Sequence, residues 1–532
     1  MKKQTKVLVK SKVKTKKSAL IKNLRVRFAP SPTGYLHIGG LRTAFYNYLL
    51  AKKNNGKFIL RIEDTDRARS VPGGVEAIIS ALSRAGLEYS EGVFLKNGKL
   101  VEKGKYGPYI QSKRLKIYKK YVEELLKKDN AYYCFCTAER LEEMRQDQVI
   151  KKAPPMYDGR CRDLKKDEIK KLLKSKTPYV IRMKIPKEGT TGFKDLIRGD
   201  VFFENRLVDD QVLMKSDGFP TYHLANVVDD HLMKITCVIR GEEWLSSTPK
   251  HILLYEAFGW KAPQFAHMPL LLNPDKSKLS KRQGDVAVED YLNKGYLPEA
   301  ILNFLAILGW SPEGEKEIFS VKELIKKFDF AKLGKSGAVF NLEKLDWLNG
   351  HYLRSKSLKE FADLCVPYLE DAKLIKKIKT GFVVEDTGEI IKKEWLQKVL
   401  KLEQERVKHL SEISYFAELF FKRKLDYNFE LLLWHKTREM PTEKRKSEAV
   451  FRLNRMVSFF ETLQKNNFEE KVLEKKIVEI IASEDLGTGD TLWPFRVALS
   501  GRQASPGPFE LATVLGREKV LKRLNDAIGK LK

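Results

Sequence analysis

A short basic segment near the middle of the chain has side chains suited to phosphate chemistry. Residues Lys278-Leu279-Ser280-Lys281-Arg282 lie between two turn signals, at 273–275 and 283–285, so we expect them to form a loop. Lysine ammonium groups act as point charges on phosphoryl oxygens, and such a loop could hold the phosphates of a substrate. A solvated surface loop would carry the same charges. The interpretation therefore depends on a partner elsewhere in the chain.

The expected partner is a strand, a tight loop and a helix start near the N-terminus. Residues 26–29 are expected to form a short buried strand, and residues 30–34 break it with two prolines and a glycine. A predicted helix then begins at His37-Ile38-Gly39-Gly40. Backbone N–H groups and the helix dipole converge on an anion at such a junction. Gly39 and Gly40 would let a base or a ribose approach the backbone.

Three carboxylates follow the next predicted strand. Residues 58–62 form that strand, and Glu63, Asp64 and Asp66 come at its carboxyl end. Ligands of open α/β sheets lie beyond these strand ends, so the carboxylates could recognise an amino group or magnesium. A solvated acidic turn is the alternative.

Four residues further along are candidate metal ligands. Cys134, Cys136 and Cys161 could supply three thiolates to one tetrahedral zinc ion, with Asp163 as an oxygen donor. The usual fourth Cys or His is missing nearby. Three free thiols in a reducing cell would explain the same residues equally well.

Alternating strands and helices must position these groups. Further strands are expected at residues 180–185, 201–203, 209–215 and 237–240, and the last two begin the second half of the sheet that starts at residue 26. Residues 76–130 and 290–350 are predicted to be helical, and the second stretch includes the expected core residues Trp310, Phe328 and Trp347. Beyond residue 355 the strand signals fade, and an all-α region is predicted.

Length and composition limit the classes of protein. A chain of 532 residues is too long for one core. Its net charge of +30 favours a polyanionic partner, nucleic acid first, although a lysine-rich genome would produce a similar balance. The five cysteines suggest a reducing compartment, and no apolar stretch is long enough for a transmembrane helix. The lysine-rich residues 1–23 are either a disordered arm that touches nucleic acid or a solvated tail.

Taken in order, these motifs resemble class I aminoacyl-tRNA synthetases, and specifically the bacterial-type glutamyl-tRNA synthetase family. The matching segments are residues 29–34 with 37–40, 62–66, 222–226 and 278–282. The resemblance covers nearly all of residues 24–532. Gly40 departs from the family pattern, because a second histidine often ends the first signature. Asp163 departs as well, because zinc-containing members place a histidine there.

The resemblance implies an α/β fold: a Rossmann-like catalytic domain with an inserted acceptor-binding domain, followed by an all-α C-terminal anticodon-binding region. The implied bounds are a basic tail at 1–23, catalytic halves at 24–107 and 206–275, the insertion at 108–205, a stem-contact region at 276–350 with the Lys278–Arg282 loop, and the anticodon-binding region at 351–532.

The implied reaction joins L-glutamate to ATP as glutamyl-adenylate and then transfers it to the 3′-terminal adenosine of tRNA-Glu. His37 and Lys281 would be catalytic by neutralising phosphate charge. Glutamate would be held by Arg27, Ser31, Glu63, Tyr222, Asn226, Arg240 and Trp244. ATP would be held by His37, Gly39, Gly40, Glu243, Leu271, Lys278, Ser280 and Lys281, with Mg²⁺ on its phosphates. A cytoplasmic monomer without membrane attachment is expected. Without the resemblance, Arg27 and Arg240 would be interpreted as structural salt bridges.

Three alternatives stay open. The enzyme could also charge tRNA-Gln, which depends on anticodon contacts that the sequence does not locate. A relative that places glutamate on a modified tRNA base lacks an anticodon domain, so the extra helical residues argue against it. A non-catalytic RNA-binding relative is disfavoured because His37, Glu63, Arg240 and Lys281 are intact.

Overall fold

The computed structural model describes residues 23–279, 286–312, 314–464 and 468–532. The chain divides into two compact units. The first unit contains residues up to 289 together with 305–340, and the second contains residues 290–304 and 341–532. The predicted tail, apart from Asn23, and the predicted residues Ser280 and Lys281 lie outside the described residues. Among the described helices, none combines the length and the hydropathy needed to cross a bilayer.

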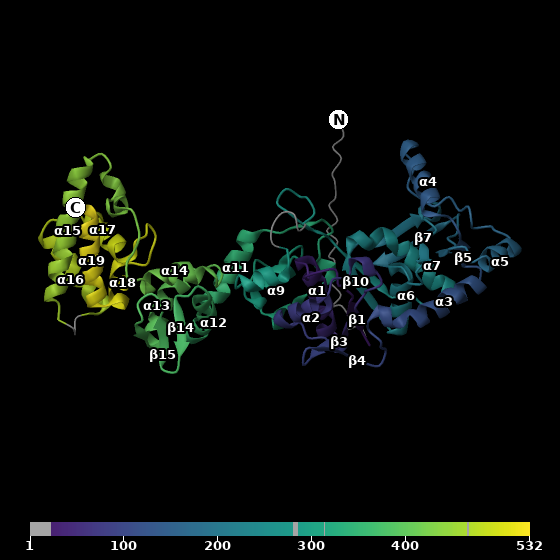
Figure 1. Ribbon diagram of the computed structural model, residues 1–532, viewed down its shortest axis with the longest axis horizontal. Helices are drawn as coiled ribbons and strands as arrows, with labels where there is room; N and C mark the ends of the chain where they lie inside the picture. The colour runs from purple at the N-terminus through teal and green to yellow at the C-terminus, as the bar shows by residue number, and fades with distance from the viewer. Residues whose placement is uncertain (1–22, 280–285, 313, 465–467) are drawn as a thin grey trace, which may run out of the picture. The chain divides into compact units, whose positions relative to one another are not determined.

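The first unit contains both strands and helices (Figure 1). Its elements are β1 (Arg25–Phe28), α1 (Ile38–Lys53), β2 (Lys57–Leu60), α2 (Gly74–Arg84), β3 (Glu91–Lys96), β4 (Lys99–Lys103), α3 (Leu115–Lys127), β5 (Ala131–Cys134), α4 (Ala138–Ile150), α5 (Lys166–Lys174), β6 (Val180–Met183), β7 (Thr190–Asp195), β8 (Gly199–Glu204), β9 (Val212–Met214), α6 (Tyr222–Leu232), β10 (Cys237–Gly241), α7 (Thr248–Phe258), β11 (Gln264–Met268), β12 (Leu271–Leu272), α10 (Val321–Lys327) and β13 (Ala338–Val339).

Two four-stranded sheets meet at the centre of this unit. One has the order β1-β2-β3-β4 and the other β10-β11-β7-β8, and each is parallel except for its last pair. The inner strands β1 and β10 lie side by side, and the N–H of Thr236 donates to the carbonyl of Arg25 at 2.9 Å. The strand order therefore runs outward in opposite directions from the contact between β1 and β10. Open α/β sheets bind ligands at such a reversal of strand order.

The stretch predicted to be helical over residues 76–130 is helical only at its two ends. Between α2 and α3, strands β3 and β4 form an antiparallel hairpin. Asn97 and Gly98 join them, both with positive φ (50° and 72°). An Asn-Gly pair is the strongest short signal for such a hairpin, so this segment could have been predicted from the sequence.

The second unit is mainly helical. Its elements are α11 (Leu342–Arg354), α12 (Leu358–Asp371), β14 (Ile375–Ile378), β15 (Gly381–Val384), β16 (Ile390–Ile391), α13 (Lys393–Gln404), α14 (Glu412–Phe421), α15 (Thr442–Thr462), α16 (Glu470–Ser483), α17 (Thr488–Ser500), α18 (Pro508–Leu515) and α19 (Arg517–Leu531), and α8 (Val288–Asn293) and α9 (Pro298–Ile307) include residues of both units. The small antiparallel sheet β14–β16 is an exception that the sequence did not predict.

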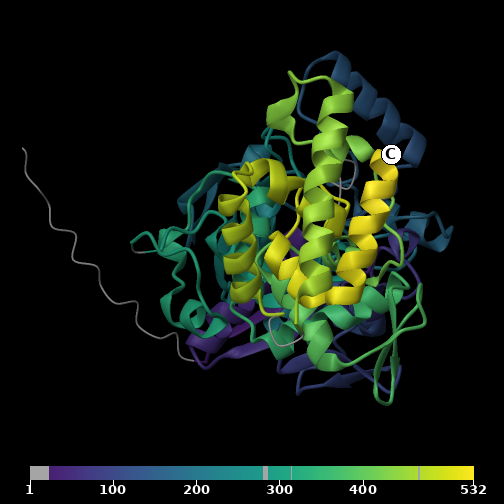
Figure 2. The ribbon, with the colours of Figure 1, turned by 90° about the vertical axis from the view of Figure 1, so that its left-hand side faces the viewer.

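One continuous hydrophobic core holds the second unit together. In Figure 2 the helices of residues 442–531, coloured yellow-green to yellow, run side by side, and α15, α17 and α19 contact one another. Leu453, Phe460, Phe495 and Leu524 are fully buried between them. Trp347, which was predicted to be a core residue, is instead 47% exposed, and the ammonium of Lys344 lies 4.1 Å from its ring centre.

Candidate active site

A cavity of about 700 Å³ opens at the carboxyl ends of β1, β2 and β10. Most of the residues predicted to hold glutamate line it, namely Arg27, Ser31, Glu63, Tyr222, Arg240 and Trp244. Asn226 does not line it but lies behind it, where its side-chain oxygen accepts a hydrogen bond from Nη2 of Arg27 at 3.3 Å. The indole of Trp244 packs on the Tyr222 ring with centroids 4.1 Å apart, which gives the cavity an aromatic wall.

A second cavity, of about 340 Å³, adjoins the first, because Thr43, Gly241 and Glu243 line both. Six of the residues predicted to bind ATP line the second cavity: His37, Gly39, Gly40, Glu243, Leu271 and Lys278. The other two, Ser280 and Lys281, lie outside the described residues. Within the described chain, the predicted ATP residues therefore come together beside the predicted glutamate residues.

His37 is fixed by the start of α1. It is the N-cap residue, and its Nδ1 accepts a hydrogen bond from the backbone N–H of Gly39 at 3.0 Å. An imidazole nitrogen that accepts carries no proton, so the neutral ring has its hydrogen on Nε2. A Cβ at position 39 would lie 3.2 Å from Nδ1, which explains why glycine suits this position. The cap thus prepares His37 to donate from Nε2.

One described flank of the basic loop is hydrogen-bonded to this helix start, and the other lines the same cavity as His37. The N–H of Ile38 donates to the carbonyl of Val286 at 2.8 Å, and the N–H of Val288 donates to the carbonyl of Leu36 at 2.8 Å. On the other flank, Leu279 donates to the carbonyl of Leu271 at 3.1 Å, and Lys278 lines the second cavity. Segments some 240 positions apart in the sequence therefore meet beside His37.

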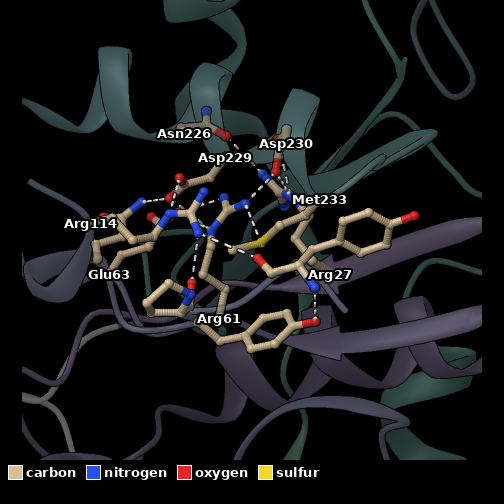
Figure 3. A network of polar contacts seen from close by, with 12 residues as sticks. Arg27, Arg61, Glu63, Arg114, Asn226, Asp229, Asp230 and Met233 are labelled. Atoms are coloured by element: carbon tan, nitrogen blue, oxygen red, sulfur yellow. Dashed lines mark hydrogen bonds and ion pairs between the residues drawn. The ribbon is translucent and has the colours of Figure 1, made fainter. Parts of the chain in front are cut away.

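A buried network of charges supports the floor of the larger cavity (Figure 3). Arg61 is its centre: Nη2 donates to Glu63 at 2.8 Å, and Nη1 donates to Asp230 at 2.6 Å. Nε of Arg27 donates to the same Asp230 at 3.1 Å. Further out, Nε of Arg114 donates to Asp229 at 2.7 Å, and Asp229 lies 3.9 Å from Arg61. All six side chains are buried, and their three positive and three negative charges balance, as buried ions require.

Burial and pairing act differently on the two carboxylates next to Arg61. Burial raises the pKa of Glu63 above its usual range, and Arg61 and Arg27 offset only part of that effect. Burial acts in the same direction on Asp230, but the charges of Arg27 and Arg61 outweigh it and hold the pKa of that carboxyl below its usual range. A cation arriving beside Glu63 would therefore favour its ionised form.

Arg240 is buried, but its neighbours are uncharged. Its hydrogen-bond acceptors are Nε2 of His267 (3.0 Å), the Tyr222 hydroxyl (3.0 Å), Nδ1 of His251 (3.2 Å) and Oγ1 of Thr248 (2.9 Å). Among the described residues, no carboxylate lies within 4.0 Å of its guanidinium nitrogens. A buried charge without a counterion is unfavourable, so this group is suited to receive an anionic ligand.

Comparisons with known proteins agree with this geometry. Residues 23–347 match the family described as "tRNA synthetases class I (E and Q), catalytic domain", and residues 355–528 match the "Anticodon binding domain". Glutamate–tRNA ligase from Clostridioides difficile is 45% identical to this chain, over 94% of the chain and 98% of that relative. The one from Chloroherpeton thalassium is 47% identical over 96% and 98%. The chain belongs to the class I glutamate–tRNA ligase family.

A solved structure extends this agreement to three dimensions. The crystal structure of a glutamate tRNA ligase from Elizabethkingia meningosepticum in complex with its amino acid is 39% identical. It has a TM-score of 0.82 and covers 96% of this chain and 100% of that chain. The class I Rossmann-like fold and the helical C-terminal region predicted from the sequence are thereby confirmed for this member of the glutamate–tRNA ligase family.

The cysteine cluster of this family member lies apart from the two cavities. The sulfur atoms of Cys134, Cys136 and Cys161 lie within 4.8 Å of one another. The fourth predicted ligand, Asp163, is exposed and does not belong to the group. The hydroxyl of Tyr157 takes that place, 3.4 Å from the sulfur of Cys134 and 3.3 Å from that of Cys136. The three thiols and one phenol oxygen form a donor set that suits a tetrahedral metal.

Several residues of the site were missed by sequence reasoning. Arg61 and Asp230 were not singled out, and neither were Thr43 and Gly241, which line both cavities. Arg61 does carry a signal, since an arginine inside an otherwise apolar strand run must have a buried partner. Of the three carboxylates after β2, Glu63 and Asp66 line the larger cavity, the first buried and the second partly exposed and paired with Arg69. Asp64 instead accepts a hydrogen bond from the N–H of Ser112 at 2.8 Å.

Proposed function

We propose that this chain activates L-glutamate with ATP and transfers it to the 3′-terminal adenosine of tRNA-Glu. The observation that carries this proposal is the pair of adjoining cavities. One offers the buried guanidiniums of Arg27 and Arg240 and the buried carboxylate of Glu63, the complement of an amino dicarboxylate. The other offers a helix N-terminus capped by His37, the complement of phosphate.

Glutamate would occupy the larger cavity. Glu63 would pair with its ammonium, and Arg27 and Arg240 would hold carboxylates, with Ser31, Tyr222 and Trp244 along the wall. Asn226 would act by holding Arg27.

ATP would occupy the second cavity with Mg²⁺ on its phosphates, since aminoacyl-tRNA synthetases in general use both. An oxygen of the glutamate α-carboxylate attacks the α-phosphorus of ATP, and the bond from that phosphorus to pyrophosphate breaks. A ribose hydroxyl of the terminal adenosine then attacks the activated carbonyl carbon, and AMP leaves. The substrates supply both nucleophiles, so the protein needs only to position them and neutralise charge. His37 would donate from Nε2 to a phosphoryl oxygen, and Lys278 and Lys281 would add positive charge.

The second unit would bind the anticodon end of the tRNA. Its match to an anticodon-binding domain over residues 355–528 and the net charge of +30 support this role. Residues 108–205 would approach the acceptor end. We propose tRNA-Glu as the substrate, and tRNA-Gln as a second substrate only if charging of it is observed.

A zinc ion would suit the cysteine cluster. Cys134, Cys136 and Cys161 would be ligands, with the phenol oxygen of Tyr157 in place of the predicted Asp163. Zinc held in this way crosslinks residues around β5 to the loop before α5 and contributes to folding rather than to the reaction.

Aminoacylation of purified tRNA-Glu and tRNA-Gln, assayed side by side, tests the proposal. We expect charging of tRNA-Glu that depends on ATP and glutamate. Arg240→Ala should raise the glutamate concentration required far more than the ATP concentration, because Arg240 lines only the glutamate cavity. Failure to charge either tRNA would refute the proposal, and an equal rise in both requirements would remove Arg240 from the glutamate site.

A further inference from the structure

Arg240 lies at the junction of two lines of hydrogen-bonded side chains. On one side, Nη1 of Arg240 meets Nδ1 of His251, and Nε2 of His251 lies 3.0 Å from Nδ1 of His223. On the other side, Nε of Arg240 donates to Nε2 of His267, whose Nδ1 lies 2.7 Å from the carboxylate of Asp195. We call these five residues the Arg240 chain.

The protonation of the Arg240 chain follows from the guanidinium alone. A guanidinium only donates, so Nδ1 of His251 and Nε2 of His267 must both be unprotonated acceptors. His251 then carries its proton on Nε2 and donates it to Nδ1 of His223. His267 carries its proton on Nδ1 and donates it to Asp195. Each of the three rings is therefore neutral, with one defined tautomer.

Burial keeps these rings neutral. It lowers the pKa of His251 well below the usual range, and the charge of Arg240 lowers it further. Burial also lowers the pKa of His267, against the opposing effect of Asp195. For His223, burial together with Lys250 and Arg240 lowers the pKa to about 3. The rings can thus accept from Arg240 throughout the neutral pH range.

The two cavity arginines consequently differ in charge balance. Arg27 shares Asp230 with Arg61 inside the balanced network, so its charge is compensated by the protein. Arg240 is held just as firmly, but by neutral acceptors and by the Phe265 ring, whose centre is 5.6 Å from the guanidinium carbon. The carboxylate of Asp195 is separated from it by a whole imidazole ring and is occupied by the N–H groups of Ile197 and Arg198.

We propose that His251 and His267, oriented by His223 and Asp195, are positioning residues: as neutral acceptors they fix the guanidinium of Arg240 and leave its charge available to the substrate carboxylate. The inference rests on the proposed function. The reacting α-carboxylate must reach ATP in the second cavity, which Arg240 does not line, so Arg240 is assigned to the side-chain carboxylate. A carboxamide there leaves the buried guanidinium uncompensated, and glutamine is rejected.

A matched pair of variants at one buried position tests this. His251→Gln keeps a neutral acceptor beside Arg240, whereas His251→Glu supplies a carboxylate of nearly the same size. We expect His251→Glu to raise the KM for glutamate by about 10²-fold, because its own carboxylate takes the place of the substrate's. His251→Gln should raise it by only a few-fold. The KM for ATP should change by less than about threefold in both. Pyrophosphate exchange with tRNA present measures all of these.

Discrimination between glutamate and glutamine gives a second measurement, which a purely structural role of His251 would leave unchanged. The ratio of kcat/KM for glutamate to that for glutamine should fall at least about tenfold in His251→Glu relative to His251→Gln. Equal glutamate KM values and equal ratios in the two variants would overturn the inference while leaving the proposed function intact. If the unaltered chain showed no glutamate-dependent exchange, the proposed function and this inference would both fall.

Asp195→Asn tests the other side of the chain. An amide can donate to Nδ1 of His267 and so stabilise the tautomer that points Nε2–H at Arg240, where it opposes the guanidinium N–H. We expect a rise of about tenfold or more in the KM for glutamate, with the KM for ATP within about threefold. An unchanged KM for glutamate would remove His267 and Asp195 from the inference.

Discussion

Replacing Arg61 with methionine should destabilise the first unit strongly, because Arg61 is the centre of its buried charge network. The guanidinium is fully buried and is the ion-pair partner of Glu63. Without it, Glu63 is left as a buried carboxylate with no ion-pair partner among the described residues. Breaking a buried pair by removing one partner costs about 3–5 kcal/mol.

A second substitution, Glu63→Gln, tests whether the loss of stability comes from the unbalanced charge or from the altered packing. Arg61→Met leaves three carboxylates against the guanidiniums of Arg27 and Arg114. Adding Glu63→Gln restores the balance at two against two. The double variant should therefore regain most of the lost stability while still binding glutamate poorly, because Glu63 is the proposed partner of its ammonium. Buried pairs replaced as pairs are often neutral in stability.

Hydrogen exchange of the β2 and α6 amides is a suitable measurement, because it reports on this unit alone. A loss of 3–5 kcal/mol lowers their protection by roughly two to four decades. If Arg61→Met costs less than about 1 kcal/mol, or if Glu63→Gln recovers none of the loss, the idea that charge balance holds this site together is wrong.

Four further outcomes are expected. His37→Ala and His37→Asn should each slow activation by about 10²- to 10³-fold, as measured by pyrophosphate exchange. Only His37→Ala should also lower the stability, by about 1 kcal/mol in thermal unfolding, because asparagine still caps a helix. Tyr157→Phe should lower zinc affinity about tenfold or more, and Asp163→Ala should not, as metal content after dialysis will show. Burial lowers the pKa of His223 from 6.5 to about 3, so the unfolded chain takes up the proton first. The free energy of unfolding, measured in urea, should therefore decrease as the pH is lowered from 6.5 to about 3, and it should decrease less in His223→Gln. Lys281→Ala, a prediction from sequence alone, should cut activation strongly and leave tRNA binding, measured by anisotropy, nearly intact.

The parts of the site that are local in sequence could be predicted. The short strand pattern predicted β1, the two prolines predicted the loop after it, and the glycine pair predicted the start of α1. Each of these signals acts over only a few residues. The basic loop at residues 278–282 and the helix start at residues 37–40 were expected to meet. The backbone hydrogen bonds from Ile38 to Val286 and from Val288 to Leu36 join the described parts of these segments. These steps need only propensity and the rule that ligands lie beyond parallel strand ends.

Contacts between distant segments could not be predicted in the same way. Nothing local in the sequence places Asp195, His251 and His267 around Arg240, because strand order across the sheet decides it. The sequence brought three of the four predicted metal ligands together correctly, but it misplaced Asp163 for a related reason. Asp163 is near Cys161 in sequence, but its side chain is exposed, whereas the fold brings in Tyr157.

The outer end of the buried charge network joins α6 to the segment that leads into α3. Arg114 directly precedes α3, and Gln111 and Tyr118 bind the same Asp229 at 2.9 and 2.8 Å. A segment outside the proposed glutamate cavity thus shares ions with residues that line it. Under the proposed function, binding of glutamate and binding of the tRNA acceptor end would be thermodynamically linked, and the factor by which one changes the affinity for the other would be the same in both directions.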